Sequence, residues 1–125
     1  MRLPIQYAFS YPDRLPADCG RVDFPALGTL TFERPDTKRF RNLALAMAAM
    51  EQGGNLPCIL NAANEVVVSA FLHDRLGFLQ MSDVVEQTMQ RAAFVAKPSY
   101  EDYVATDAEA RRIAAEIAAQ MEKIR

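Results

Sequence analysis

The uneven distribution of proline limits what the first part of this chain can fold into. Five of the seven prolines fall within the first 35 of 125 residues. Proline lacks a backbone N–H and disfavours a helical conformation in the residue before it, so no long helix can cross this region. We therefore expect an extended N-terminal arm made of short pieces. These prolines are Pro4, Pro12, Pro16, Pro25 and Pro35.

Two stretches of the arm have a local pattern. Residues 4–11 fit a short helix opened by Pro4, but their apolar residues also alternate as in a strand, and so short a run leaves both possibilities open. Residues 27–33, LGTLTFE, carry β-branched and aromatic residues and predict a short strand. An isolated strand is not stable. Since no second convincing strand follows, its partners are expected in a part of the protein outside this sequence.

Beyond the arm, the pattern predicts four helices. The first runs from a capping Asp36 to the Gly-Gly pair at 53–54. The second carries Pro57 in its first turn, where proline is favoured, runs to about Leu76 and stops at Gly77.

The third predicted helix opens at Ser82 and Asp83 and ends before Pro98. Thr106 with Glu109 predicts a capping box for the fourth. Arg111, Arg112, Glu116 and Lys123 are expected on the outer face of that last helix. The apolar positions expected to face the core are Phe40, Leu43, Leu45, Met47, Met50, Val84, Val85, Met89, Ala92, Ile113, Ile117, Met121 and Ile124.

The expected fold is therefore mainly α. Short connections between four helices predict a four-helix bundle over residues 36–125. The extended arm, residues 1–35, precedes it and carries the one short strand.

A polar cluster interrupts the apolar stretch LPCILNAANEVVVSAFL, residues 56–72. A helix that is apolar almost all round is expected at the centre of its bundle. At about 100° per residue, Asn61, Asn64 and Glu65 share one face of this helix. They form either a carboxylate held by two amides, as a general base or ligand, or a structural set that bonds an adjoining loop.

The structural interpretation of this cluster is favoured. A single carboxylate with no second acid, lysine or suitably placed histidine nearby is poor catalytic equipment. His73 lies about 80° round the helix from Glu65, so the two do not form a metal clamp. His73 is expected to make a favourable contact at the helix C-terminus instead. Buried polar groups usually bond one another, so replacing Asn64 with leucine is expected to lower stability.

Composition excludes several classes of function. The net charge is −2 with no basic stripe, which argues against nucleic-acid binding. No apolar run is long enough to cross a membrane, and no secretory signal pattern is present. Cys19 and Cys58 match neither a zinc spacing nor a CxxC motif and are expected as reduced thiols in a cytoplasmic protein. Tyr100 and Tyr103 are expected to anchor a loop on the bundle.

Four segments in order resemble the C-terminal part of 1-deoxy-D-xylulose 5-phosphate reductoisomerase. Two of them, MRLPIQYAFSYPDR at 1–14 and LNAANEVVVSAFL at 60–72, carry the clearest likeness. Between them lie VDFPALGTLTFERPD at 22–36 and RFRNLALAMAAMEQGG at 39–54. The resemblance extends over essentially the whole sequence.

The resemblance implies an enzyme of non-mevalonate isoprenoid biosynthesis. Such an enzyme uses NADPH and a divalent metal, Mg or Mn, to convert 1-deoxy-D-xylulose 5-phosphate to 2-C-methyl-D-erythritol 4-phosphate. It is a homodimer whose subunit has a nucleotide-binding domain, a catalytic domain and a C-terminal helical bundle. Residues 1–10 would end the catalytic domain, residues 11–35 would connect it to the bundle, and residues 36–125 would be the bundle.

The resemblance places no catalytic, cofactor-binding or metal-binding residue in this sequence. In the family those residues lie upstream, in the nucleotide-binding and catalytic domains that would be the partners of this chain. Met1 is the nearest candidate, because the family has a methionine there close to its active site. The Asn61, Asn64 and Glu65 cluster belongs to the bundle, which again favours a structural role.

Three functions are compatible with the sequence itself. The first is support of the catalytic domain within the reductoisomerase. The second is a free-standing helical interaction module without catalysis, which predicts an apolar groove and a partner. The third is a small enzyme using Glu65 and His73, which predicts a pocket at Glu65 with His73 facing it. Under the first, residues 1–35 alone are expected to be poorly ordered or to pair with another copy.

Overall fold

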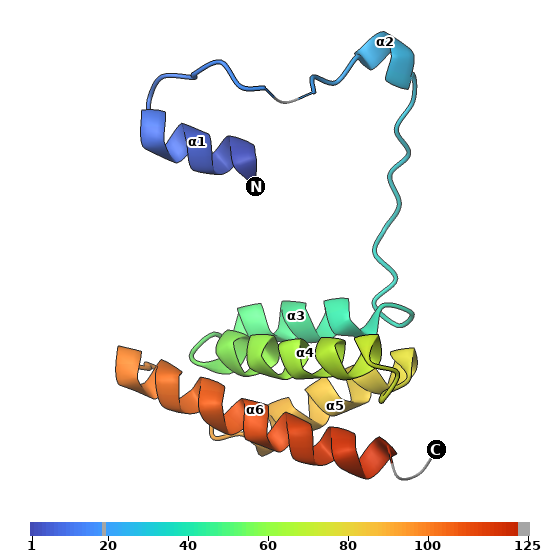
Figure 1. The fold of residues 1–125 in the computed structure, drawn as a ribbon, viewed down its shortest axis with the longest axis vertical. Coiled ribbons are helices and arrows are strands. Elements are labelled where there is room, and N and C mark those ends of the chain that lie inside the picture. Colours follow the sequence, from blue (N-terminus) through green and yellow to red (C-terminus); the bar gives the residue numbers. More distant parts are fainter. Residues whose placement is uncertain (19, 123–125) are drawn as a thin grey trace. The chain divides into compact units, whose positions relative to one another are not determined.

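The described part of the chain forms six helices, which fall into two compact units. The computed structural model describes residues 1–18 and 20–122, and the two units are Met1–Arg34 and Pro35–Arg125. The described residues contain no strand, so the fold is mainly α, as predicted (Figure 1). The expectations for Cys19, Lys123 and Ile124 fall outside the described residues.

The N-terminal unit holds two short helices, α1 (Arg2–Ser10) and α2 (Phe24–Leu27). Of the two possibilities for residues 4–11, the helix is the one observed. The Gln6 side-chain amide donates to the carbonyl oxygen of Pro16 at 3.0 Å and so fastens the following loop to α1. None of this unit's described residues is buried, so it has no hydrophobic core of its own.

The predicted strand at residues 27–33 is wrong. Leu27 ends α2, and Gly28, with a φ of 71°, closes the helix by donating its N–H to the Phe24 carbonyl oxygen. The rest of the stretch is irregular. A strand needs a neighbouring strand to accept and donate its backbone hydrogen bonds, and the described part of this chain supplies none.

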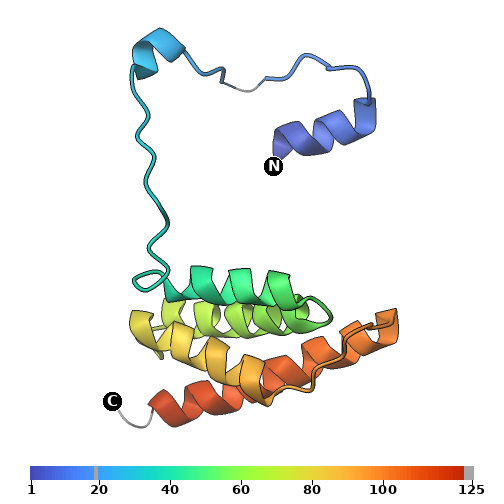
Figure 2. The same ribbon diagram turned by 180° about the vertical axis from the view of Figure 1, so that it is seen from behind.

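The second unit is a bundle of four helices centred on α4. The helices are α3 (Arg41–Gln52), α4 (Leu56–Leu72), α5 (Phe78–Arg91) and α6 (Tyr100–Glu122). α4 packs against all three of the others, and α5 also packs against α3 and α6. Figures 1 and 2 show α4 lying between α3 and α6.

The core of the bundle forms along the apolar sides of α4, α5 and α6. Alanines of α4, valines of α4 and α5, and isoleucines of α6 fill it. Small residues such as Ala62 and Ala63 let the helices approach closely. Val84, Val85, Ile113 and Ile117 point inward as predicted. The largest fully buried apolar side chains are Ile59, Ile117, Val67, Val84 and Val85.

The start of α6 differs from the prediction. A capping box at Ser99 and Asp102 opens the helix: the Ser99 N–H donates to Asp102 Oδ2 at 2.8 Å, and the Asp102 N–H donates to Ser99 Oγ at 3.2 Å. The TxxE sequence at Thr106 has the same form but lies inside the helix. Both sequences satisfy the capping pattern, and the segment after Pro98 is the one at which the chain turns.

Other helix ends also differ from the predicted ones. Asp36 caps an isolated turn by accepting from the N–H groups of Lys38 and Arg39, so α3 begins later, at Arg41. α5 begins at Phe78, because Gly77 and the Gln80 side chain already form its N-terminal cap. α4 ends at Leu72, ahead of the predicted Leu76, and α5 ends at Arg91.

The orientation predicted for α3 is also wrong. The side chains that face solvent are those of Phe40, Leu43, Met47 and Met50. The side of α3 that packs against the bundle carries the half-buried Leu45 and one small residue. The small residue buried there is Ala49. The apolar positions of α3 lie on both sides of the helix, so periodicity did not show which side would be covered.

Asn55, in the turn between α3 and α4, is a polar residue with no exposed surface. Its Nδ2 donates to the Ala93 carbonyl oxygen and to Thr106 Oγ1, both at 2.9 Å. Its Oδ1 accepts from the Val95 N–H at 2.9 Å, and its own N–H donates to the Val95 carbonyl oxygen at 3.0 Å. Asn55 therefore joins the α3–α4 turn to the α5–α6 loop and to α6.

Replacing Asn55 with alanine should destabilise the bundle strongly. The change leaves the half-buried Val95 N–H and the buried Thr106 hydroxyl without their partner, which should cost roughly 3 kcal/mol of unfolding free energy. Urea unfolding of the 125-residue chain, followed by helical circular dichroism, measures this.

Asn61→Ala is the matched control, since Asn61 is also an asparagine of this segment but lies at the surface. It should change the unfolding free energy by less than about 0.5 kcal/mol. Equal losses at the two positions would contradict the role given to Asn55.

Candidate functional site

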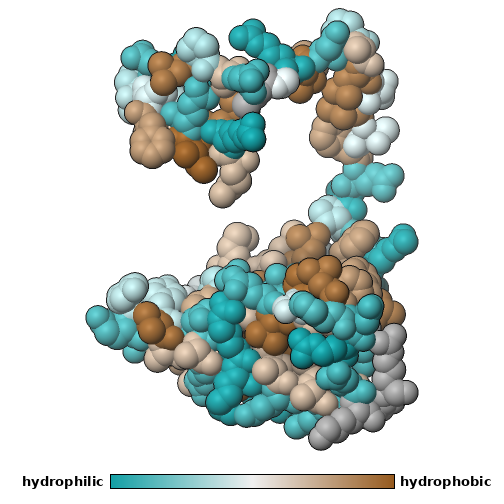
Figure 3. Space-filling model, in the orientation of Figure 1, coloured by the Kyte–Doolittle hydropathy of each residue, from teal (hydrophilic) through white to brown (hydrophobic). Residues whose placement is uncertain are grey.

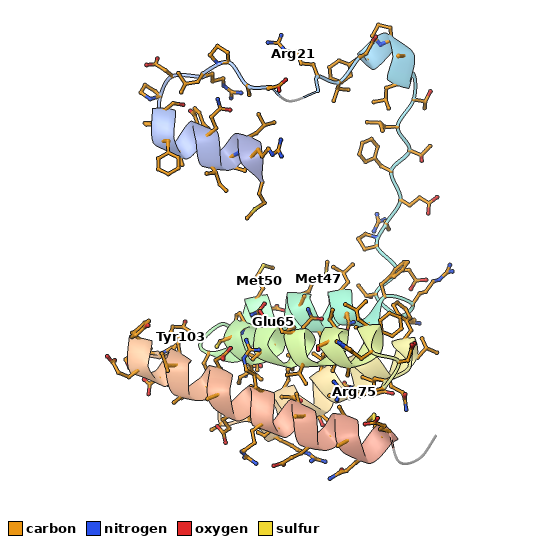
Figure 4. The ribbon with its side chains drawn as sticks, in the orientation of Figure 1. Arg21, Met47, Met50, Glu65, Arg75 and Tyr103 are labelled. Atoms are coloured by element: carbon orange, nitrogen blue, oxygen red, sulfur yellow. The ribbon has the colours of Figure 1, made fainter. Side chains whose placement is uncertain are left out.

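The polar cluster predicted on α4 forms an ion-pair network with α6. Asn61 Nδ2 donates to Glu65 Oε1 at 3.2 Å. The other carboxylate oxygen, Oε2, accepts from Arg111 of α6 at 2.7 Å. Arg111 also donates through Nε to Asp107 Oδ2, one turn earlier on α6, at 2.7 Å. Figure 4 labels Glu65 on α4.

The structure corrects the burial expected for this cluster. Asn61 and Glu65 are exposed, and Asn64 is only half-buried and takes no part in the network. α4 is packed by three helices but not surrounded by them, so the face with Asn61 and Glu65 remains open to solvent. Because of this, the larger stability loss is expected at Asn55 and not at Asn64.

Electrostatics hold the network in its charged form. The hydrogen bond from Arg111 lowers the pKa of Glu65, and the hydrogen bond from Asn61 lowers it further. In return, Asp107 and then Glu65 raise the pKa of Arg111. A general base works best when its pKa lies near the working pH, and Glu65 is shifted away from neutrality. The arrangement suits an ion pair that links two helices.

A groove of about 380 Å³ lies beside this network, between α4 and α6. Glu65 and Arg111 line it together with Ser69 and Arg75. His73 is not among its lining residues: its Nδ1 lies 2.7 Å from the Ser69 carbonyl oxygen, at the end of α4. The pocket expected of a Glu65 and His73 enzyme is thus present at Glu65, but the histidine does not face it.

Cys58 and Tyr103 meet where α4 begins. The Cys58 thiol contacts the Tyr103 carbonyl oxygen at 3.7 Å, and the Tyr103 hydroxyl donates to the Gly54 carbonyl oxygen at 3.4 Å. Burial, followed by the charge of Asp107, raises the pKa of the Cys58 thiol, and a protonated thiol is a weak nucleophile. Tyr103 holds the α3–α4 turn as an anchor, whereas Tyr100 is exposed.

Two residues of this region were missed from the sequence. The sequence gives no distinct signal for Asn55, because the two glycines before it already account for the end of the preceding helix. Arg111 was placed on the outer face of α6, and its pairing with Asp107 could have been read from their four-residue spacing on one helix. Its contact with Glu65, which is distant in the sequence, depends on how α4 and α6 cross and so leaves no local signal in the sequence.

The described residues contain no group of three or more histidine, cysteine, aspartate or glutamate side chains able to hold a metal ion. They also contain no helix both long and apolar enough to cross a membrane.

Removing the Arg111 charge should raise the pKa of Glu65. In Arg111→Met the carboxylate loses its strongest hydrogen bond, and its pKa should move up toward the ordinary glutamate value. Carbon-detected NMR titration of the Glu65 carboxyl group measures this in both proteins. An identical titration midpoint in the two would show that the ion pair does not form in solution.

The same pair predicts how stability depends on pH. The folded-state pKa of Glu65 lies below its value in the unfolded chain. Its stabilising contribution is therefore present above the unfolded-state pKa and is lost as pH falls through the folded-state pKa. The difference in unfolding free energy between the natural chain and Glu65→Gln should accordingly shrink in acid.

Comparison with known proteins gives one consistent result. The family model described as "DXP reductoisomerase C-terminal domain" matches residues 1–113. A relative from Bacteroides thetaiotaomicron, a 1-deoxy-D-xylulose 5-phosphate reductoisomerase, is 73% identical over 117 residues, which are 94% of this chain and 30% of the relative. A reductoisomerase from Bacillus cereus is 46% identical over 93% of this chain and 31% of its own length.

Solved structures agree with the sequence relatives. The reductoisomerase from Zymomonas mobilis in complex with NADPH has a TM-score of 0.81 and 41% identity, covering 94% of this chain and 31% of that one. A reductoisomerase in complex with magnesium has a TM-score of 0.78 and 27% identity, covering 95% and 32%. The chain thus spans about 30% of the length of the curated relatives it matches. It belongs to the DXP reductoisomerase C-terminal domain family.

Proposed function

We propose that this chain is the C-terminal part of a 1-deoxy-D-xylulose 5-phosphate reductoisomerase. The observation that carries the proposal is the identity of 73% to the Bacteroides thetaiotaomicron enzyme, which extends over 94% of the chain. The whole protein would rearrange 1-deoxy-D-xylulose 5-phosphate and reduce the product with NADPH to 2-C-methyl-D-erythritol 4-phosphate. A free-standing interaction module is not favoured, because it gives no reason for that identity.

Within such an enzyme the bundle would be a structural support. Residues 1–10 would end the catalytic domain, residues 11–35 would connect, and residues 36–125 would form the supporting domain. Two observations favour a supporting role for the bundle. Glu65 of its polar cluster is ion-paired with Arg111 across α4 and α6, and the buried Asn55 uses its side chain to join segments of the bundle. The Asn61, Asn64 and Glu65 cluster would then stabilise the fold and not act on substrate.

NADPH and magnesium would be held elsewhere in the enzyme. Solved relatives bind them, but the described residues of this chain offer no group of metal-ligating side chains. The preceding nucleotide-binding and catalytic domains would be its partners in a cytoplasmic homodimer.

A chimera tests the proposal. This chain would replace the matching C-terminal part of the Bacteroides thetaiotaomicron reductoisomerase, and NADPH consumption with 1-deoxy-D-xylulose 5-phosphate would be followed by absorbance. We expect kcat and KM within about three-fold of the parent enzyme, a barrier change under roughly 1 kcal/mol. A folded but inactive chimera would refute the proposed function.

The chimera also separates support from catalysis at Glu65. If Glu65 only links α4 to α6, Glu65→Gln should leave kcat within about two-fold, because a true general base contributes about 10²–10⁴-fold. Asn61→Ala, on the same exposed face, is the matched control. A hundred-fold loss of kcat in Glu65→Gln alone would make Glu65 a catalytic residue.

A further inference from the structure

The outer side of α3 is apolar, whereas the surface of a soluble helical bundle is expected to be polar. Phe40, Leu43, Met47 and Met50 are spaced by three, four and three residues, and at about 100° per residue they fall within one quarter of the helix circumference. All four are exposed, Met47 by 42% and Met50 by 75%. A surface helix normally turns charged residues toward solvent.

This face is fixed by what lies on the other side of α3. Leu45 and Ala49 pack into the bundle, and Arg41 pairs with Asp83 at 2.6 Å and with Glu86, both on α5. α3 therefore cannot turn its large apolar side chains inward without giving up these contacts. Figure 4 shows the Met47 and Met50 side chains pointing away from α4.

The apolar face continues onto the start of α5. A groove of about 530 Å³ is lined by Phe40 and Leu43 from the α3 end and by the exposed Phe78 and Leu79 of α5. Apolar residues gather along the α3 edge of the bundle in Figure 3. Contiguous exposed apolar surface of this kind, together with a groove, marks an interaction site in a soluble protein.

We propose that the α3 face, defined as Phe40, Leu43, Met47 and Met50 with the adjoining groove, is the surface on which the preceding part of the same reductoisomerase chain packs. The inference rests on the proposed function. The relatives are about three times as long as this chain, which is 30% of the Bacteroides thetaiotaomicron enzyme. A covalently attached domain is present at a very high effective concentration and needs no second binding signal.

The composition of the face fits a permanent contact of this kind. Its centre is made of large apolar side chains without charge, like a domain core cut in half, whereas transient interfaces are more polar. The charged residues that also line the groove are Lys38, Arg39, Arg41 and Asp83, of which Arg41 and Asp83 are paired with each other. An interaction module would use the same groove for a separate partner, and a second copy of this chain would cover it only at high concentration.

Methionine oxidation measures whether the face is covered. Hydrogen peroxide converts an accessible thioether to its sulfoxide and leaves water, at a rate that follows exposure. The rates at Met47 and Met50 would be measured by peptide mass spectrometry in the 125-residue chain and in the chimera described above. Met81, which is 7% exposed within the core, serves as the internal reference.

We expect Met50 to oxidise at least about ten-fold more slowly in the chimera than in the 125-residue chain, with Met81 slow in both. Equal rates for Met50 in the two proteins would overturn the proposal. Protection that already appears in the 125-residue chain and increases with its concentration would also overturn it, in favour of a second copy.

A charge substitution provides an independent readout. Met50→Lys should lower the melting temperature of the chimera by several degrees, since it places a charge in the contact, and should leave the 125-residue chain unchanged, since Met50 is already in water there. Val104→Lys, on α6 away from α3 and 55% exposed, is the control and should change neither. Equal melting temperatures for Met50→Lys and the natural chimera would overturn the proposal.

The outcome is separable from that of the proposed function. An active chimera with a freely oxidised Met50 would leave the function standing and reject the docking face. An inactive chimera with a protected Met50 would reject the function and retain the docking face.

Discussion

The bundle depends on one buried amide. Asn55 uses both ends of its side chain and its own N–H to hold the α3–α4 turn, the α5–α6 loop and α6 together. Farther along α6, Arg111 reaches across to Glu65 of α4 and ties the same two helices together. Because Asn55 is fully buried and its side-chain oxygen and nitrogen are both bonded, the arrangement resists change: an alternative packing would leave this amide without partners.

How far the sequence specified this structure varied with the kind of signal. Four bundle helices, a central α4 and the inward Val84, Val85 and Ile117 followed from periodicity and from helix-ending glycines. Helix starts were harder to predict, since the TxxE sequence at Thr106 matches the capping pattern as well as Ser99 and Asp102 do. The strand at 27–33 failed because β propensity has no effect without a partner strand. Asn55 could not be recognised, because its importance comes from residues about forty and fifty positions away.

α3 shows why burial is harder to predict than helix formation. Its sequence has apolar residues on two sides of the helix, and helical periodicity alone does not say which side meets the bundle. The small side, with Ala49, packs against its neighbours, whereas the large side, with Phe40 and Met50, stays open. In a chain that spans 30% of its relatives' length, such a surface is best understood as a contact for the remaining domains.

We propose that the bundle supports the catalytic part of one reductoisomerase by packing against it. Differential scanning calorimetry of the chimera tests this directly, because domains that share a large apolar contact unfold together. We predict that the bundle unfolds within the same transition as the rest of the enzyme, at a temperature different from that of the 125-residue chain alone. A separate bundle transition, at the temperature of the isolated chain, would contradict the account.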